Sequence, residues 1–487
     1  MKSPPNPVHS LEVDKRVADP VHGLIRLTPV ESQVLQHPIF QRLRDVTQLG
    51  IAKYVYPGAM HNRFTHSLGV LQNATTIFDV AYRNWHRSPQ LSGDIEEDQL
   101  FSEFILQATR LAAMCHDLGH FPFSHNLEQA LDWMEQTKVI KHTFRHEQLS
   151  AVIIREVLGD ILGDYTEVVA GLIENNYTAL QGCLFPAFVV SSAIDADRMD
   201  YLLRDAMHCG VDQGRYDRER LLDSIIPYAT RINGSSYDVL GFKSKGIEAV
   251  EQFLLARHRM HQTVYFNPSV VGFEAGLRRA YYQISTDNPP WELPSVYLDD
   301  PHQFIDFNEA QFFTQLKSEL KQRQSWLSKP IVNRQPLQKF GPFYFTMVTN
   351  RELSAEDREK FSLLKESQVK LENPAEDWYQ DDHWVYVENK TQTLVSPLPR
   401  STTRADGFED VKSLKNAIML VNAHGDLIDP TDAAYGHTFL PYITENTYHR
   451  FLFFTAKSNG NRLRQELADL LEIYEDFTTR PIRPADS

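Results

Sequence analysis

Three histidines and one aspartate fall within a stretch of ten residues, and their side chains could bind a metal. These residues are His116, Asp117, His120 and His125. Imidazole and carboxylate groups together suit a borderline divalent metal such as Mn, Fe or Zn. Residues 104–113 carry apolar side chains at helical spacing, so the cluster should lie at the end of a buried helix. A histidine-rich helix end without a metal is the competing interpretation, and this stretch alone does not decide between the two.

Two distant residues could complete a metal site with His116 and Asp117. His66 lies at the start of a predicted helix that runs to Ala81, and Asp197 lies on another predicted helix. Metal sites in helical proteins are commonly built from side chains on facing helices. A divalent metal held this way can lower the pKa of water and polarise a phosphoryl oxygen. The four residues therefore predict a metal-dependent reaction at a phosphoester.

Phosphoester cleavage also needs groups that neutralise charge and transfer protons. Guanidinium groups bind two phosphate oxygens at once, and the candidates are Arg63, Arg198 and Arg257. Imidazole titrates near neutral pH, and the candidates for acid or base are His120, His125 and His146, with Glu147 placed to orient or charge one of them. Tyr201 and Tyr265 could contact a sugar or stack on a base. A lone histidine at a helix end is more often a cap or a buried structural group, and this interpretation is kept for His22, His37, His86 and His142.

The composition indicates a globular protein of 487 residues and restricts its partners. The formal net charge is −15, which argues against a broad nucleic-acid-binding surface but is compatible with an anionic substrate in a local cleft. The three cysteines show neither a disulfide pattern nor metal-binding spacing, and the first residues show no secretory signal. No apolar run is long enough to span a membrane, so we expect a cytoplasmic protein.

The pattern of apolar residues predicts a mostly α-helical fold with a smaller C-terminal α+β domain. We expect an N-terminal arm with little structure over 1–18, a helical domain over 19–335 and an α+β domain over 336–487. Long helices are expected at 246–265 and 302–326, and a last one at 461–474. Strands are expected at 237–242, 343–348, 384–388, 417–421 and 448–455.

Beyond the candidate ligands, six segments resemble a known family. They are 19–23 (DPVHG), 40–44 (FQRLR), 61–70 (HNRFTHSLGV), 116–125 (HDLGHFPFSH), 145–148 (RHEQ) and 195–201 (DADRMDY). Their order and spacing over residues 15–285 resemble the SAM- and HD-domain-containing deoxynucleotide triphosphohydrolases and their bacterial relatives. The histidine and aspartate order alone is a weak signature, but the whole set is specific. No SAM domain precedes the HD region in this sequence.

The resemblance implies hydrolysis of a dNTP to a deoxynucleoside and tripolyphosphate. It implies that the metal ligands are His66, His116, Asp117 and Asp197, and that the metal is Mn, Fe, Mg or Zn, with Ni or Co as substitutes in vitro. It places His125 near the 5′ oxygen and the α-phosphate, with His120 and His146 as the acid and base around it. Arg63, Arg198 and Arg257 would hold phosphates, and Tyr201, Asp205 and Tyr265 the sugar. It also implies a homo-oligomer, a dimer or tetramer, that an activating nucleotide can switch on.

Several positions depart from the family pattern. Arg198 stands where a lysine is expected, and Phe266 where a glutamine is expected. Gln36 and Ala18 replace an aspartate and an asparagine that contact the guanine of an activating nucleotide. Lys15, Gln41 and Arg44 remain available to contact a phosphate or base at such a site.

Two other classes of function compete with the triphosphohydrolase. One is another HD-type phosphohydrolase or phosphodiesterase, but the DG-x-x-YP pattern of cyclic-dinucleotide enzymes and the ED pair of alarmone hydrolases are absent. The other is a nucleotide-sensing or nucleic-acid-binding module without turnover, and the intact set of candidate ligands argues against it.

Overall fold

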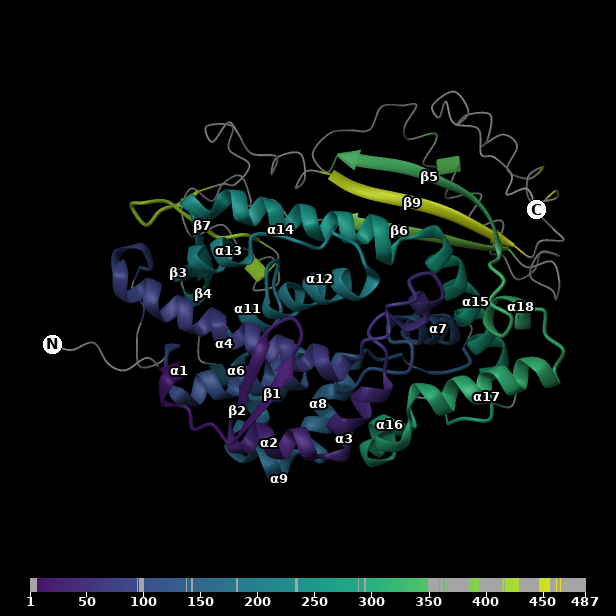
Figure 1. The fold of residues 1–487 in the computed structure, drawn as a ribbon, viewed down its shortest axis with the longest axis horizontal. Coiled ribbons are helices and arrows are strands. Elements are labelled where there is room, and N and C mark those ends of the chain that lie inside the picture. The colour runs from purple at the N-terminus through teal and green to yellow at the C-terminus, as the bar shows by residue number, and fades with distance from the viewer. Residues whose placement is uncertain are drawn as a thin grey trace.

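Helices form most of the described chain, and a long central one, α4 (Arg63–Arg87), runs through the middle of the view in Figure 1. The computed structural model describes residues 7–348 apart from 94, 96–99, 137, 142, 181–182, 233–234, 288 and 293–294. Beyond these it describes 385–393, 414–428 without 416, 446–455 and a few isolated positions. The prediction of a mostly α fold is confirmed.

Three helices lie against one another and bring their ends together. Helix α4 packs against α6 (Glu103–Cys115) and α12 (Ala196–Cys209). Each begins where a side-chain oxygen accepts from a backbone N–H of the first turn: Asn62 caps α4, Ser102 caps α6 and Asp195 caps α12. These caps determine where each helix starts. Packing of the three helices then places the first turns of α4 and α12 beside the C-terminal end of α6.

The other helices surround this group. From the N-terminus they are α1 (Pro7–Ser10), α2 (Pro29–Gln36), α3 (Pro38–Gln41), α7 (His125–Gln136), α8 (His146–Glu156), α9 (Gly159–Leu162), α10 (Thr166–Glu174), α11 (Phe185–Val190), α13 (Arg218–Ser224), α14 (Ile247–Met260), α15 (Pro268–Ser285), α16 (Val296–Asp299), α17 (Glu309–Gln322) and α18 (Ser328–Ile331). Two large clusters of buried apolar side chains fill the spaces between them.

A β-hairpin precedes the helices. Strand β1 (Lys15–Asp19) pairs antiparallel with β2 (Gly23–Leu27), and Asp19 accepts hydrogen bonds from the N–H groups of Val21 and His22 in the turn. β1 therefore begins inside the segment 1–18 that we expected to have little structure. Pairing with β2 supplies the backbone hydrogen bonds that make β1 a strand. The polar sequence of β1 gives no local indication of this pairing.

Two further sheets involve the C-terminal part of the chain. Strands β3 (Ile225–Ile232), β4 (Ser235–Lys243), β7 (Leu420–Val421) and β8 (Leu427–Ile428) form one sheet, in which β7 runs parallel to β4. Strands β5 (Gln338–Val348), β9 (Asn446–Thr455) and β6 (Val385–Thr393) form the other, which lies in the upper part of the view in Figure 1. The second sheet contacts α15 through Phe454 and Leu452. The division of the chain at residue 335 stays a prediction, although the segment 414–428 lies against the helical part.

Two predicted helices differ in extent from those observed. The helix expected at 246–265 is regular only to Met260, and a turn of π-helix (His261–Tyr265) follows. The helix expected at 302–326 is limited to α17, because Asn308 caps a new start and a separate 3₁₀ turn (Pro301–Asp306) precedes it. Most of the segment 461–474 lies outside the described residues.

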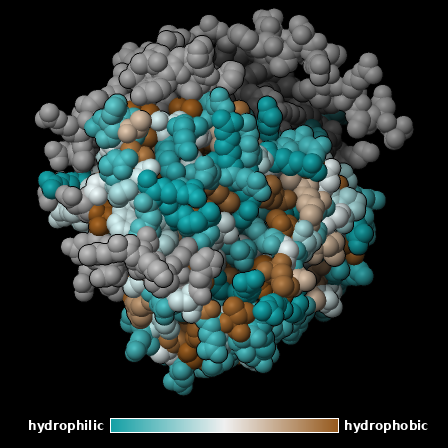
Figure 2. Space-filling view, turned by 60° about the vertical axis from the view of Figure 1, so that its left-hand side comes forward, coloured by the Kyte–Doolittle hydropathy of each residue, from teal (hydrophilic) through white to brown (hydrophobic). Residues whose placement is uncertain are grey.

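The exposed face in Figure 2 is mostly hydrophilic, with hydrophobic residues in small separate groups. None of the helices in the described part of the chain has the length and apolar character that crossing a membrane requires.

Candidate active site

The ends of α4, α6 and α12 bring His66, His116 and Asp197 together. One donor atom from each lies within 4.8 Å of the other two. The Nε2 atom of His66 is 3.0 Å from Oδ1 of Asp197, and Nε2 of His116 is 3.9 Å from the same oxygen. Asp117 adds a fourth group, because its Oδ2 lies 3.7 Å from Nε2 of His66 and its Oδ1 lies 3.2 Å from Nε2 of His116. Three of the four predicted ligands therefore form one compact cluster, and Asp117 lies beside it in contact with both imidazoles.

Asp117 also pairs with the buried Arg63. The Nη1 atom of Arg63 lies 2.5 Å from Oδ2 of Asp117, and its Nε donates to the hydroxyl of Ser124. Burial alone would raise the pKa of Asp117, but Arg63, His116 and His120 hold it well below its usual range. The carboxylate is therefore ionised and able to bind a cation.

A buried ion network supports His66 from behind. Its Nδ1 lies 2.7 Å from Oδ2 of Asp200, whose Oδ1 is 2.6 Å from Nε2 of His22. Arg204, which is fully buried, donates to Asp200 and to Asp19 in the turn of the β1–β2 hairpin. A carboxylate behind a metal-binding imidazole fixes the ring and its tautomer. The network therefore leaves Nε2 of His66 directed at the candidate metal site.

Burial alone would lower the pKa of His66, but hydrogen bonds to Asp197 and Asp200 outweigh it and raise the pKa to about 10. In the absence of a cation, the imidazole is thus protonated between two carboxylates. A cation at Nε2 would replace that proton.

A second group of titratable side chains lies beside the first. Glu128 accepts from both Nδ1 of His125, at 2.9 Å, and Nδ1 of His146, at 2.8 Å. His120 stacks on His146 with a distance of 3.6 Å between ring centroids, and its Nε2 lies 3.2 Å from Oδ1 of Asp117. The contact between His120 and Asp117 joins the two groups into one continuous site.

The protonation of this second group follows from its charges. Burial would raise the pKa of Glu128, but hydrogen bonds from His125 and His146 lower it well below its usual range. Burial would lower the pKa of His146, but Glu128 raises it. Burial, Arg63 and His146 lower the pKa of His120, and its contact with Asp117 does not outweigh them. The stacked pair thus combines a neutral His120 with a readily protonated His146.

Local backbone features place these side chains. Phe123 and Ser124 both adopt left-handed conformations, with φ of 59° and 52°, just before His125 starts α7. Gly119 allows α8 to approach closely, because a Cβ atom there would overlap the backbone of His146. These positions turn the chain away from the metal ligands and toward the second group.

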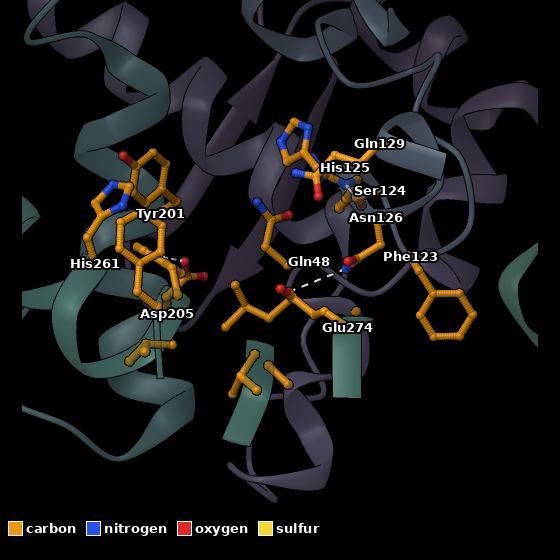
Figure 3. Close-up of a pocket in the computed structure, with 18 residues that line it drawn as sticks. Gln48, Phe123, Ser124, His125, Asn126, Gln129, Tyr201, Asp205, His261 and Glu274 are labelled. Carbon is orange, nitrogen blue, oxygen red and sulfur yellow. Dashed lines mark hydrogen bonds between the residues drawn. The ribbon is translucent and has the colours of Figure 1, made fainter. Parts of the chain in front are cut away.

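Two cavities meet at this site. One, of about 290 Å³, is lined by most of the predicted residues: Arg63, His66, His116, Asp117, His120, His125, His146, Glu147, Asp197, Arg198 and Tyr201. The other, of about 370 Å³, shares Gln48, Arg63, His125 and Tyr201 with the first and adds Asp205 and Tyr265. Figure 3 shows Tyr201, His261 and Asp205 on one side of the second cavity and His125, Asn126 and Gln129 on the other. The shared residues make the two cavities parts of one cleft.

The predicted sugar contacts are held by hydrogen bonds. The hydroxyl of Tyr265 donates to Oδ2 of Asp205 at 2.7 Å, and Nε2 of His61 lies 2.7 Å from Oδ1. Burial and the carboxylate of Asp205 raise the pKa of Tyr265 well above its usual value, so the hydroxyl stays a donor. Tyr201 contacts Tyr265 edge to face in the same wall.

Four other predicted residues lie elsewhere. Arg257 is not among the described residues that line the two cavities; it interacts with Tyr201, and burial lowers the pKa of its guanidinium. Arg44 donates to Gln41 at 2.8 Å on the surface and covers the ring of Phe64, while Lys15 begins β1. An allosteric role for Lys15, Gln41 and Arg44 stays a prediction.

Sequence reasoning missed several residues that support the site. Glu128 is one turn after His125 on α7, and Asp200 and Arg204 follow Asp197 on α12, so helical spacing could have found them. His22 is a buried structural histidine, as the sequence analysis predicts, and its partner is Asp200. The polar residues Asn126, Gln129 and Glu274 in the second cavity gave no signal of this kind.

Comparison with known proteins identifies the class. Residues 63–205, which hold the whole metal cluster, match the model of the HD domain, so this chain contains an HD domain. Its resemblance to the HD-domain deoxynucleoside triphosphate triphosphohydrolase family is confirmed, with curated relatives of that name at 28–32% identity.

Three similar proteins show the extent of the likeness. An uncharacterized protein of Methanocaldococcus jannaschii, MJ1154, is 33% identical over 266 residues, which are 55% of this chain and 49% of the relative. Human deoxynucleoside triphosphate triphosphohydrolase SAMHD1 is 30% identical over 238 residues, or 43% of this chain and 35% of the relative. The chain thus spans half or less of these curated relatives. A crystal structure of a hypothetical protein from Aquifex aeolicus shares the fold, with a TM-score of 0.63 and 22% identity over 93% of this chain and 99% of that chain.

Proposed function

We propose that this protein is a metal-dependent triphosphohydrolase that converts a dNTP into a deoxynucleoside and tripolyphosphate. The observation that carries the proposal is the single cleft in which the two histidine groups adjoin a cavity of nucleoside size. The triphosphohydrolase name of the SAMHD1 relatives supports the choice of reaction.

The donor set fits a divalent ion. Two imidazoles and the carboxylate of Asp197 cluster together, Asp117 lies beside them, and Asp200 holds one imidazole in a fixed orientation. His66, His116, Asp117 and Asp197 would hold the ion, with Mn, Fe, Mg or Zn as candidates. When bound, such an ion supplies charge neutralisation at a phosphoryl oxygen and acidifies water.

The chain's own residues would bind and align the triphosphate. Arg63 lines both cavities, and Arg198, beside Asp197, lines the cavity of the metal ligands. Both guanidinium groups are held by carboxylates, Arg63 by Asp117 and Arg198 by Asp195. A guanidinium fixed in this way loses little entropy when a phosphate oxygen replaces water beside it.

Proton transfer would involve the second group. Water adds to the α-phosphorus and gives up one proton, the bond from phosphorus to O5′ breaks, and O5′ takes up one proton, so the number of protons is conserved. His125 lines both cavities and has its Nδ1 on Glu128, so its Nε2 can serve the leaving oxygen. The same Glu128 stabilises the protonated form of His146, which can return a proton to this second group of histidines. Glu147 lies 3.3 Å from Nδ1 of His146.

The sugar would lie against Tyr201, Tyr265 and Asp205. The carboxylate of Asp205 can accept from a 3′-hydroxyl, and the ring of Tyr201 would leave no room for a 2′-hydroxyl. We further propose a homo-oligomer in the cytoplasm, with an activating nucleotide bound near Lys15, Gln41 and Arg44.

The test is to incubate the purified protein with each dNTP and Mn or Mg, and to identify the phosphate product. We expect tripolyphosphate and deoxynucleoside. Asp197→Ala should abolish turnover and metal binding while the protein remains folded, because the Asp197 side chain is 31% exposed. Release of pyrophosphate or monophosphate instead would refute the proposal.

A further inference from the structure

The cavity beside His125 contains polar side chains that the proposed reaction does not use. They include Gln48, Asn126, Gln129 and Glu274. Apolar residues share the cavity with them, namely Leu49, Val264, Phe266 and Val270. Apolar surface with a few convergent polar groups is typical of a site for a flat heterocycle, whose faces need apolar contact and whose edge needs hydrogen bonds. The sugar residues Tyr201 and Asp205 lie across the cavity from Asn126 (Figure 3).

A buried arginine fixes the orientation of two of these side chains. Arg278 on α15 is fully buried, and its Nη1 donates to Oδ1 of Asn126 at 3.0 Å and to Oε1 of Gln129 at 2.6 Å. A guanidinium has no acceptor, so both amides must present their oxygens to it. Their NH₂ groups therefore point elsewhere.

The amide of Asn126 in turn meets Glu274. Its Nδ2 donates to Oε1 of Glu274 at 3.3 Å, as the dashed line in Figure 3 marks. A carboxylate has about four acceptor positions, so this bond leaves others on Glu274 for a ligand. Gln129 offers a hydrogen-bond donor, because its oxygen accepts from Arg278 and its Nε2 is left to donate. The cavity thus combines a carboxylate acceptor with an amide donor.

The four nucleobases satisfy this combination to different degrees. Guanine presents two adjacent donors, N1–H and the 2-amino group, next to the acceptor O6. A carboxylate can accept from both donors at once, and an amide NH₂ can donate to O6. Adenine and cytosine offer one amino group each, and thymine offers a single N3–H.

We propose that Glu274, Asn126 and Gln129, oriented by Arg278, form a site that reads the edge of the substrate base and favours guanine. This inference rests on the proposed function, because it takes the cavity as the nucleoside site of a dNTP triphosphohydrolase. It adds the base preference, with Glu274 as the principal specificity residue and Arg278 as a positioning residue.

The test compares kcat/KM for the four dNTPs in the wild type and in Glu274→Gln, which keeps the shape of the side chain but replaces one acceptor by a donor. We expect dGTP to be the best substrate of the wild type. In Glu274→Gln the ratio of kcat/KM for dGTP to that for dATP should fall by roughly 10- to 100-fold, the range for loss of a bidentate contact to a base. Glu248→Gln, an exposed glutamate on α14, is the matched control and should leave the ratio unchanged.

Binding of the four deoxynucleosides, measured by calorimetry, separates this inference from the proposed function. If no dNTP is hydrolysed but deoxyguanosine binds best and Glu274→Gln removes that preference, the proposed reaction fails and base reading stands. If tripolyphosphate is released from all four dNTPs at equal rates, or Glu274→Gln lowers all four equally, the base-reading site is refuted and the reaction stands. A folded state with the wild-type melting temperature should accompany each variant.

Discussion

The Nδ1 atom of His66 lies 2.7 Å from Oδ2 of Asp200, and both side chains are buried. Asp200 also contacts His22 and Arg204, so the candidate metal ligand is tied to the turn of the N-terminal hairpin. Asp200, His22 and Arg204 would touch neither metal nor substrate, but they set the orientation of a candidate metal ligand.

The first prediction concerns this support. Asp200→Asn should weaken Mn binding by about 10- to 100-fold, the usual effect of losing a carboxylate behind a metal-binding imidazole. Calorimetric titration of the apoprotein with Mn measures the affinity. Asp212→Asn is the control, because that side chain is 86% exposed just after α12. Equal Mn affinity in Asp200→Asn and wild type would show that Asp200 is purely structural.

A second prediction follows from the proton on His66. Its pKa of about 10 in the absence of a cation means that binding must displace a proton. Metal affinity should therefore rise with pH by about tenfold per unit while His66 is the group that must ionise. Calorimetry in buffers of different ionisation enthalpy should show release of about one proton per ion near neutral pH. Binding with no buffer dependence would contradict this account.

The same pKa has a consequence for the apoprotein. The pKa of His66 in the folded state lies above its ordinary 6.5. The contribution of protonated His66 to the free energy of unfolding is therefore fully present below pH 6.5. It is then lost as the pH rises toward 10. Denaturant titrations of the metal-free protein across this range should show a falling free energy of unfolding, and Asp200→Asn should show a smaller fall.

A third prediction tests the packing around Asp200. A Cβ atom at Gly69 would overlap Oδ1 of Asp200 and the guanidinium of Arg204. Gly69→Ala should therefore lower the free energy of unfolding by about 1–3 kcal/mol, although alanine is otherwise favoured inside a helix. Gly159→Ala is the control, because the nearest atom to its Cβ would be 4.0 Å away. Urea denaturation measures both, and equal stability of the two variants would refute the overlap.

The sequence was sufficient for the helical class, and it supplied the candidate metal ligands, whose binding of an ion stays a prediction. Motif spacing placed His66, His116, Asp117 and Asp197 on separate helices, apart from the adjacent pair, and those helices do converge. Helical periodicity is a local property, so it survives tertiary packing. Polar side chains at buried helix ends are costly in free energy unless they pair with one another or bind an ion, which is why the cluster could be interpreted from the sequence.

The surroundings of the cluster could not be predicted in the same way. The contact of Lys415 with Asn175 joins residues that are 240 positions apart, and no local pattern encodes it. The same holds for Arg278 on α15, which donates to Asn126, 152 positions earlier in the chain. Such pairs depend on how helices pack, and a buried arginine looks like a surface one in the sequence.

The last prediction concerns the second histidine group and rests on the proposed reaction. Glu128 raises the pKa of His146, so the protonated form persists to higher pH than for a free imidazole. If this proton is needed for turnover, activity should fall on the alkaline side as His146 loses it. Glu128→Gln removes the negative charge and should move that alkaline limb to lower pH. Glu147→Gln should move it less, because Glu147 is 43% exposed and water screens its charge. The measurement is kcat/KM against pH for one dNTP in the three proteins. A limb that stays at the same pH in Glu128→Gln would remove His146 from the proton transfer and leave His125 as the acid.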